Sequence, residues 1–272
     1  MYPVSNTNID KYAQKVFILF FILMLYRIHS HAMLTYIVNQ PIKGPGVDYT
    51  FWISHLLCFP EFIIHHWWLC FAIDAGVVAL SIAAIFSRTK RNSITILLIL
   101  FFFIQRITLE SYSVSHTKSI SCLFVALLPF CFRKTENITL LIEFGRYFLI
   151  YILVISAYHK FHHGALFGQD TFSAILINQH TDLAILHPDH ISFKIAKFLT
   201  QHSALANIAF KLLFLTQAFF ITGIFTKRAD RMLFILLTGF AVSTYLVMRI
   251  YNFDIIVLGL TLLYFPVGKK RG

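Results

Sequence analysis

The sequence predicts an all-α fold, a polytopic membrane bundle of about eight transmembrane helices with short interfacial helices in a long outer loop. The 272-residue chain is 58% hydrophobic, whereas soluble domains average about 45–50%. Only 13% of the residues are charged, about half the usual share of roughly 25%. The apolar residues also form runs long enough to cross a bilayer core of about 30 Å as helices. We therefore expect one integral membrane domain over residues 1–272.

Eight apolar segments form the expected spans, and each must be helical because backbone groups that face lipid find no water to bond. The segments are 16–37, 67–86, 93–110, 119–132, 138–160, 204–225, 230–248 and 252–267. The fourth and eighth are short. In the outer loop 161–203, apolar residues recur at mixed helical spacing around Pro188, which indicates two short interfacial or re-entrant helices.

Lysine and arginine predict the orientation. Thirteen of them lie at the two termini and in the three connections that would share their side of the membrane, against five in the connections on the opposite side. The positive-inside rule then places both termini in the cytoplasm, in the cytoplasmic membrane if the source is bacterial. Membrane orientation also explains the net charge of +11 better than nucleic-acid binding does, so we expect the lipid bilayer as a partner and no nucleic acid.

The histidines follow this topology, although the topology does not depend on them. All 13 histidines fall at the outer ends of the expected spans or in the outer connections. This asymmetry predicts that the chemistry of the protein is at its outer face.

The stretch ISAYHKFHHGALFG, residues 155–168, holds the densest group of histidines. His159, His162 and His163 have the H-x-x-H-H spacing of membrane di-iron oxygenases, and neutral imidazole is a good ligand for iron, copper or zinc. His187 and His190 form a second H-x-x-H pair. A metal site would use His162, His163, His187 and His190. Di-iron enzymes have a third box, however, and no histidine follows His202.

Lys160 lies between these histidines, at the end of an expected span. A lysine there usually extends its ammonium to the membrane interface. Held neutral in a buried site, its amine can instead act as a base. In that case the catalytic group would be Lys160 with His159, His162 and His163, the histidines tuning or relaying the proton.

Further charged residues lie within or against the expected spans, where charge is costly and is normally paired inside the bundle. These residues are Arg27, Asp74, Glu143, Arg146, Lys211, Arg249 and Asp254. Glu143 and Arg146 are three positions apart on one helix face and are expected to pair with each other. Among the cysteines, Cys58 and Cys70 would be able to form a disulfide if both faced an oxidising side.

The stretch VISAYHKFHHGALFG resembles a signature in the transmembrane domain of vitamin K-dependent gamma-carboxylases, the HTTM (horizontally transferred transmembrane) domain. In that signature a helix ends with two small residues, then a lysine and an apolar residue, then a glycine-containing segment. Ser156-Ala157, Lys160-Phe161 and Gly168 match these positions, and the basic turn TKRADR (226–231) is similar as well. The resemblance covers most of the chain in layout and about 15 residues in motif. It implies that Lys160 corresponds to the lysine proposed as the base that activates reduced vitamin K.

Three functions remain open from the sequence. The first is a membrane enzyme in which Lys160 deprotonates a lipid-soluble hydroquinone, as cofactor, or a secreted peptide substrate. The second is a membrane oxidoreductase with a transition metal held by histidines. The third is a non-enzymatic accessory or transport protein whose histidines lie at the interface.

Overall fold

The computed structural model describes residues 6–38, 56, 58–87, 89–111, 123–168, 170–250 and 253–265. Within these ranges every regular element is a helix and no strand occurs, which confirms the all-α class. Among the described residues, six helical segments are long and apolar enough to cross a membrane. This number is compatible with a multi-pass membrane protein. The expected count of about eight spans is not confirmed.

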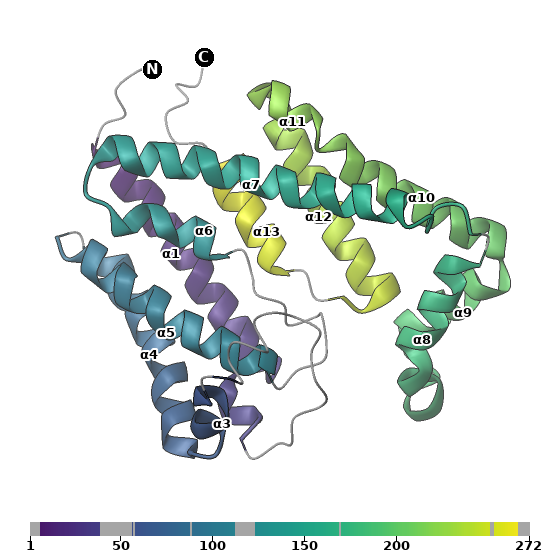
Figure 1. Ribbon diagram of the computed structural model, residues 1–272, viewed down its shortest axis with the longest axis horizontal. Helices are drawn as coiled ribbons and strands as arrows, with labels where there is room; N and C mark the ends of the chain where they lie inside the picture. Colours follow the sequence, from purple (N-terminus) through teal and green to yellow (C-terminus); the bar gives the residue numbers. More distant parts are fainter. Residues whose placement is uncertain are drawn as a thin grey trace. The chain divides into compact units, whose positions relative to one another are not determined.

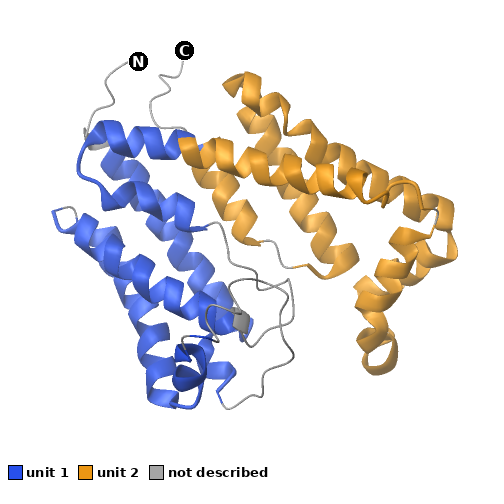
Figure 2. Cartoon of the chain, in the orientation of Figure 1, with its two compact units in different colours: residues 1–143, 265–272 blue, residues 144–264 orange. Residues whose placement is uncertain are grey.

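The chain divides into two compact units, which Figure 2 colours separately. Unit 1 comprises Met1–Glu143 and Phe265–Gly272, and unit 2 comprises Phe144–Tyr264. Helix α7 (Thr135–His162) contributes its first part to unit 1 and the remainder to unit 2. The expectation of a single membrane domain over the whole chain stays a prediction.

Unit 1 is built on three long helices, of which α4 packs against the other two (Figure 1). In chain order its elements before α7 are α1 (Asn6–His29), η1 (Leu34–Tyr36), α3 (Phe59–Ile64), α4 (Trp67–Phe86), α5 (Arg91–Ser111), α6 (Leu123–Leu127) and η3 (Leu128–Cys131). A glycine allows α4 and α5 to approach closely, because a Cβ atom at Gly76 would lie 2.5 Å from the ring of Phe101.

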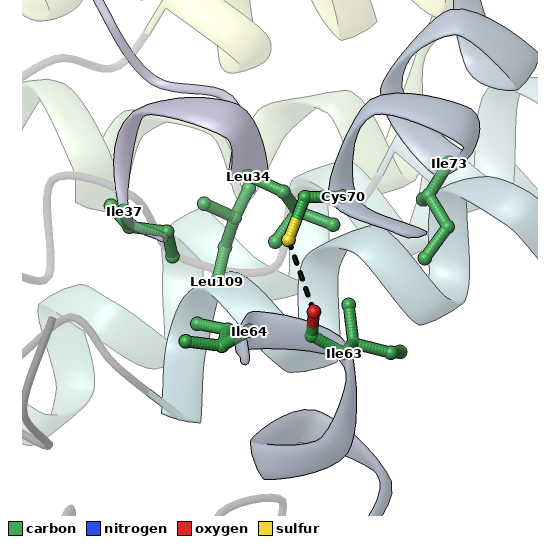
Figure 3. Close-up of a cluster of buried hydrophobic side chains, with 7 residues drawn as sticks. All are labelled: Leu34, Ile37, Ile63, Ile64, Cys70, Ile73 and Leu109. Carbon is green, nitrogen blue, oxygen red and sulfur yellow. Dashed lines mark hydrogen bonds between the residues drawn. The ribbon is translucent and has the colours of Figure 1, made fainter. Parts of the chain in front are cut away.

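One end of unit 1 is closed by an apolar cluster from four elements, η1, α3, α4 and α5 (Figure 3). Its buried members are Leu34, Ile37, Ile63, Ile64, Cys70, Ile73 and Leu109. The Cys70 thiol donates a hydrogen bond to the carbonyl of Ile63 at 3.3 Å. Cys58 and Cys70 are both free, so the disulfide that the sequence allows is not formed.

Asp74 lies beside this cluster and is 6% exposed. Its carboxyl group accepts hydrogen bonds from the backbone amides of Leu34 (3.3 Å) and Thr35 (3.0 Å), from the Thr35 hydroxyl (3.1 Å) and from Gln105 Nε2 (2.7 Å). The first two residues start the turn η1, and Gln105 belongs to α5. Asp74 therefore ties the turn after α1 to α4 and α5, and in the described residues its partners are neutral donors rather than a cation.

Polar contacts also hold the opposite end of unit 1. Arg91, at the start of α5, pairs with Asp10 of α1 at 2.6 Å. The neighbouring Asn92 donates to the carbonyl of Phe130 at 3.2 Å and to that of Phe132. These contacts attach the start of α5 to α1 and to the segment around η3.

In the two shortest expected spans, the residues that the structure describes form short helices. The segment 119–132 contains α6, five residues long, followed by the four-residue 3-10 turn η3. Pro129 stands at the start of η3, and a proline inside a helix removes one hydrogen bond and clashes with the preceding turn. The segment 252–267 contains α13 (Phe253–Gly259) and the π-helical turn η5 (Leu260–Tyr264). Twelve residues rise only about 18 Å, less than a bilayer core.

Unit 2 contains the later part of α7, a hairpin of two helices (residues 171–201, called the hairpin below) and three further apolar helices (Figure 1). Its other elements are α8 (Thr171–Leu186), α9 (Ile191–Gln201), α10 (Ser203–Phe219), α11 (Thr222–Phe225), η4 (Lys227–Ala229), α12 (Asp230–Met248), α13 and η5. Helices α8 and α9 lie against each other, which confirms two helices around Pro188, and their interfacial or re-entrant position stays a prediction. Their apolar core is Leu166, Phe172, Leu176, Ala196, Leu199, Ala206 and Phe210.

A buried ion pair fastens α7 to the turn between α11 and α12. Arg146, 3% exposed, contacts both carboxylate oxygens of Asp230, with Nη2 at 2.7 Å from Oδ1 and Nε at 3.1 Å from Oδ2. The same Nη2 donates to the carbonyl of Gly223 at 2.6 Å. Arg146 thus pairs with Asp230 rather than with Glu143, because the interior of unit 2 offers a carboxylate together with two backbone carbonyls.

Candidate functional site

Lys160 lies in the last turn of α7 and reaches into unit 2. Its Nζ donates a hydrogen bond to Oε1 of Gln217 on α10. Gln217, only 4% exposed, donates in turn from Nε2 to the hydroxyl of Ser156 at 3.3 Å. The side-chain amide of Gln217 therefore binds two residues of α7, Lys160 through its oxygen and Ser156 through its nitrogen. These contacts hold the lysine side chain in place.

A cavity of about 280 Å³ opens beside this group. Its lining comes from α7, α10, α12, α13 and Ile250. Eight of the twelve lining residues are apolar, and the four polar ones are Ser156, Lys160, Gln217 and Thr244. A mostly apolar pocket with a few converging polar groups is the usual form of a small-molecule site.

Helical spacing explains how the chain assembles this lining. Ser156 and Lys160 are four positions apart and share a face of α7. On α10, Phe210 and Gln217 recur at a spacing of seven, which is two turns of one face. On α12, the hydroxyl of Thr244 bonds the carbonyl of Phe240, one turn earlier, at 3.0 Å. Three helix faces thus bring one amine, one amide and two hydroxyls to an apolar space.

Lys160 is the only side chain among the twelve lining residues that takes up or releases a proton in the physiological range. In the described residues it forms no ion pair with a carboxylate, and it donates a hydrogen bond to the neutral amide of Gln217. An amine without a counter-charge in an apolar pocket leaves room for a ligand group that supplies one. The pocket therefore has a single candidate for acid–base chemistry.

The histidines that accompany Lys160 in the sequence lie outside the pocket. His159, His162 and His163 are exposed, and none of them is among the lining residues. The rings of His159 and His163 stack with centroids 6.0 Å apart, and those of His162 and His163 meet edge to face at 5.3 Å. The structure therefore brings the three histidines together at the helix end and separates them from the lysine amine.

The expected metal ligands are not gathered into one group. His187 and His190 flank the turn between α8 and α9, and no group of three or more His, Cys, Asp or Glu side chains able to hold a metal forms within the part of the chain that the structure describes. His55 and His116 lie outside that part. The histidine–metal hypothesis stays a prediction, and the metal content of the purified wild type and of a His162→Ala, His163→Ala variant would test it.

The hairpin adjoins the pocket, because Phe210 belongs to the core of the hairpin and to the pocket lining. Its ring stacks on Phe172 of α8 at a centroid distance of 5.1 Å. Arg249, which follows α12, binds both carboxylate oxygens of Asp182 on α8 at 2.7 Å. This hydrogen-bonded pair holds the pKa of Asp182 below its ordinary value and connects the hairpin to the end of α12.

His180 is 2% exposed and packs inside the hairpin. Its Nδ1 lies 2.9 Å from the carbonyl of Leu176 and must carry the proton to donate there, which leaves Nε2 unprotonated. Burial lowers the pKa of His180, the hydrogen bond to Leu176 opposes this effect, and the positive charge of Arg249 lowers the pKa further. Asp182 and His190 are the other ionisable groups that act on it.

We expect the hairpin to loosen on acidification. Because the folded hairpin lowers the pKa of His180, the unfolded hairpin binds more protons once the pH falls below about 6.5, and stability decreases there. The protection factors of the α8 amides, which correct for the slower intrinsic exchange at low pH, should fall several-fold between pH 7.5 and pH 5.5. A His180→Gln variant should lose most of this pH dependence, whereas His202→Gln, at an exposed position, should keep it. Equal pH dependence in wild type and His180→Gln would contradict the assignment.

Sequence reasoning identified Lys160, Arg146 and Arg249 but missed their partners, which are Gln217, Asp230 and Asp182. Gln217 and Asp182 belong to no motif, and Asp230 lies in TKRADR without being assigned a partner there. A glutamine inside the apolar run LTQAFF is nevertheless a signal that a polar contact is needed within the span. The partners lie 57, 84 and 67 positions from the residues they bind. Only the packing of α7, α8, α10 and α12 brings them together.

No protein-family model, curated protein or solved structure matches this chain. The class of the protein therefore rests on the fold and the pocket. In the part of the chain that the structure describes, they define a helical protein with six candidate membrane spans and a mostly apolar cavity whose lining includes one lysine.

Proposed function

We propose that the chain is a multi-pass membrane enzyme of the HTTM type, in which Lys160 acts as a base on a lipid-soluble hydroquinone bound in the pocket of unit 2. The observation that supports this function is the position of Lys160 as the one proton-transferring group in a pocket that is otherwise apolar or neutral. In the reaction the O–H bond of the hydroquinone breaks and an N–H bond forms at Nζ, which leaves a phenolate paired with the ammonium.

The lining favours a hydroquinone over a peptide substrate. A volume of about 280 Å³ is near the lower end of small-molecule pockets, which hold about 300–1,000 Å³, and suits an aromatic head group whose tail remains outside. A peptide backbone would need donors and acceptors at every residue, whereas the lining supplies four polar side chains. Gln217 would orient the amine through its side-chain oxygen.

The test uses a phenol whose anion absorbs at a different wavelength from the neutral form, such as a nitrophenol with an alkyl tail. Mixed with the purified protein in nanodiscs, it should bind and show the anion spectrum at a pH where the free phenol is neutral. Lys160→Met should remove the anion signal and weaken binding about tenfold to a hundredfold, because a hydrogen bond to a charged group contributes about 1.5–3 kcal/mol.

Two variants separate the pocket from general effects. Gln217→Leu keeps the amine but removes its support, so it should reduce the anion signal while the phenol still binds. Lys197→Met removes an exposed lysine of α9 and should behave as wild type. An unchanged anion spectrum in Lys160→Met would rule out this lysine as the base.

A further inference from the structure

Lys211 lies near the middle of α10 on its exposed face. Its neighbours on that face are bulky and apolar, with Ile208 55%, Leu212 58% and Leu215 58% exposed. The opposite face of the same helix carries Phe210 and Gln217, which line the pocket. Lys211 is thus separate from the Lys160 site, although both belong to unit 2.

Lys211 lies far from both ends of its expected membrane span. The apolar segment runs from Ser203 to Phe225, so Lys211 lies about 12 Å from one end and about 21 Å from the other at 1.5 Å per residue. For a bilayer core of about 30 Å centred on this segment, the backbone at Lys211 is roughly 10 Å below the nearer surface. A lysine side chain is shorter than that distance, so extension to the interface does not bring the ammonium fully into water.

Three other charged groups inside the described spans have buried partners within the chain. Arg146 and Asp230 pair with each other, and Asp74 is enclosed by hydrogen-bond donors. Lys211 has no carboxylate partner among the described residues, although an uncompensated charge toward lipid is costly and normally faces another protein group. An exposed cation within an apolar stripe therefore indicates a surface that is covered in the membrane.

We propose that this face of α10 docks a membrane helix of a second, different protein, which places an aspartate or glutamate against Lys211. The charge of Lys211 requires an acidic partner, and the exposed Ile208, Leu212 and Leu215 provide the apolar contact around it. A second copy of this chain fits less well, because the carboxylates more than about one turn inside a described span are the buried Asp74 and the half-buried Glu143, and neither is exposed. The docked carboxylate would lie near the middle of the partner's own span.

Photocrosslinking in native membranes tests the proposal. A photoreactive phenylalanine at position 208 or 215 should give one protein adduct, and the same residue at position 235, exposed on α12, should not. Lys211→Leu should reduce the adduct at least tenfold, and Lys211→Arg should retain it. After the partner is identified by mass spectrometry, Lys211→Glu combined with a lysine at the partner's acidic position should restore the adduct.

The remaining outcomes would refute it. Adducts only with lipid would mean that the face is exposed to the bilayer, and adducts within the chain or with a second copy would mean that it is covered from inside. A partner adduct insensitive to Lys211→Leu, or not restored by the charge exchange, would show that Lys211 does not recognise it. Lys211→Leu removes a charge from an apolar helix and should not unfold the protein, which its thermal unfolding in nanodiscs, compared with wild type, would check.

Discussion

Replacing Asp230 with alanine will destabilise unit 2 by about 3–5 kcal/mol, because removal of one partner leaves a buried charge uncompensated. The charge left behind is Arg146, which is 3% exposed and whose other acceptors are the carbonyls of Gly223 and Thr226. These contacts join α7, α11 and the start of α12. The free energy of unfolding can be measured in detergent over a denaturant series. Cleavage of unit 2 by trypsin would report the unfolded fraction at each step.

A second arginine–aspartate pair, Arg249 with Asp182, provides the control. Asp182 also binds an arginine at 2.7 Å, but its side chain is 54% exposed, and an exposed pair contributes about 0–1 kcal/mol. Asp182→Ala should therefore cost far less than Asp230→Ala. A double replacement, Arg146→Met with Asp230→Leu, should recover most of the stability, since both charges are removed. Similar losses for the two single aspartate variants would show that burial does not decide the cost.

Replacing Asp74 with alanine will release the turn η1 from the long helices of unit 1. The substitution leaves the backbone amides of Leu34 and Thr35 and the amide of Gln105 without their acceptor. Each unsatisfied buried group costs about 1–3 kcal/mol, so we expect a loss of about 3 kcal/mol or more. Amide exchange at Leu34 and Thr35 should rise well before exchange in the centre of α4.

Two further variants test whether the loss of stability comes from the carboxyl group of Asp74. Thr35→Val removes one hydroxyl donor and keeps the amide bonds, so it should cost about 1 kcal/mol. Asp10→Ala removes the exposed partner of Arg91 at the other end of unit 1 and should leave exchange at η1 unchanged. If Asp74→Ala left exchange at Leu34 and Thr35 at the wild-type rate, the carboxyl group would not be what holds the turn.

Composition and hydropathy were sufficient for the helical class, because a segment facing lipid has few alternatives to a helix. They also located the hairpin around Pro188, since proline interrupts the apolar pattern there. The count of spans was harder to predict. In the segments 119–132 and 252–267, the described residues 123–131 and 253–264 are apolar but form only short helices. Hydropathy does not show how far a helix extends.

The sequence by itself determined that this protein is a bundle of apolar helices with Lys160 at the end of one of them. Tertiary structure decided which groups each polar side chain meets. Lys160 binds Gln217 and not its neighbouring histidines, and Arg146 pairs with Asp230 and not with Glu143. The physical reason is that a charge in an apolar interior binds whatever partner packing delivers, and that partner comes from another helix, dozens of residues away in the chain.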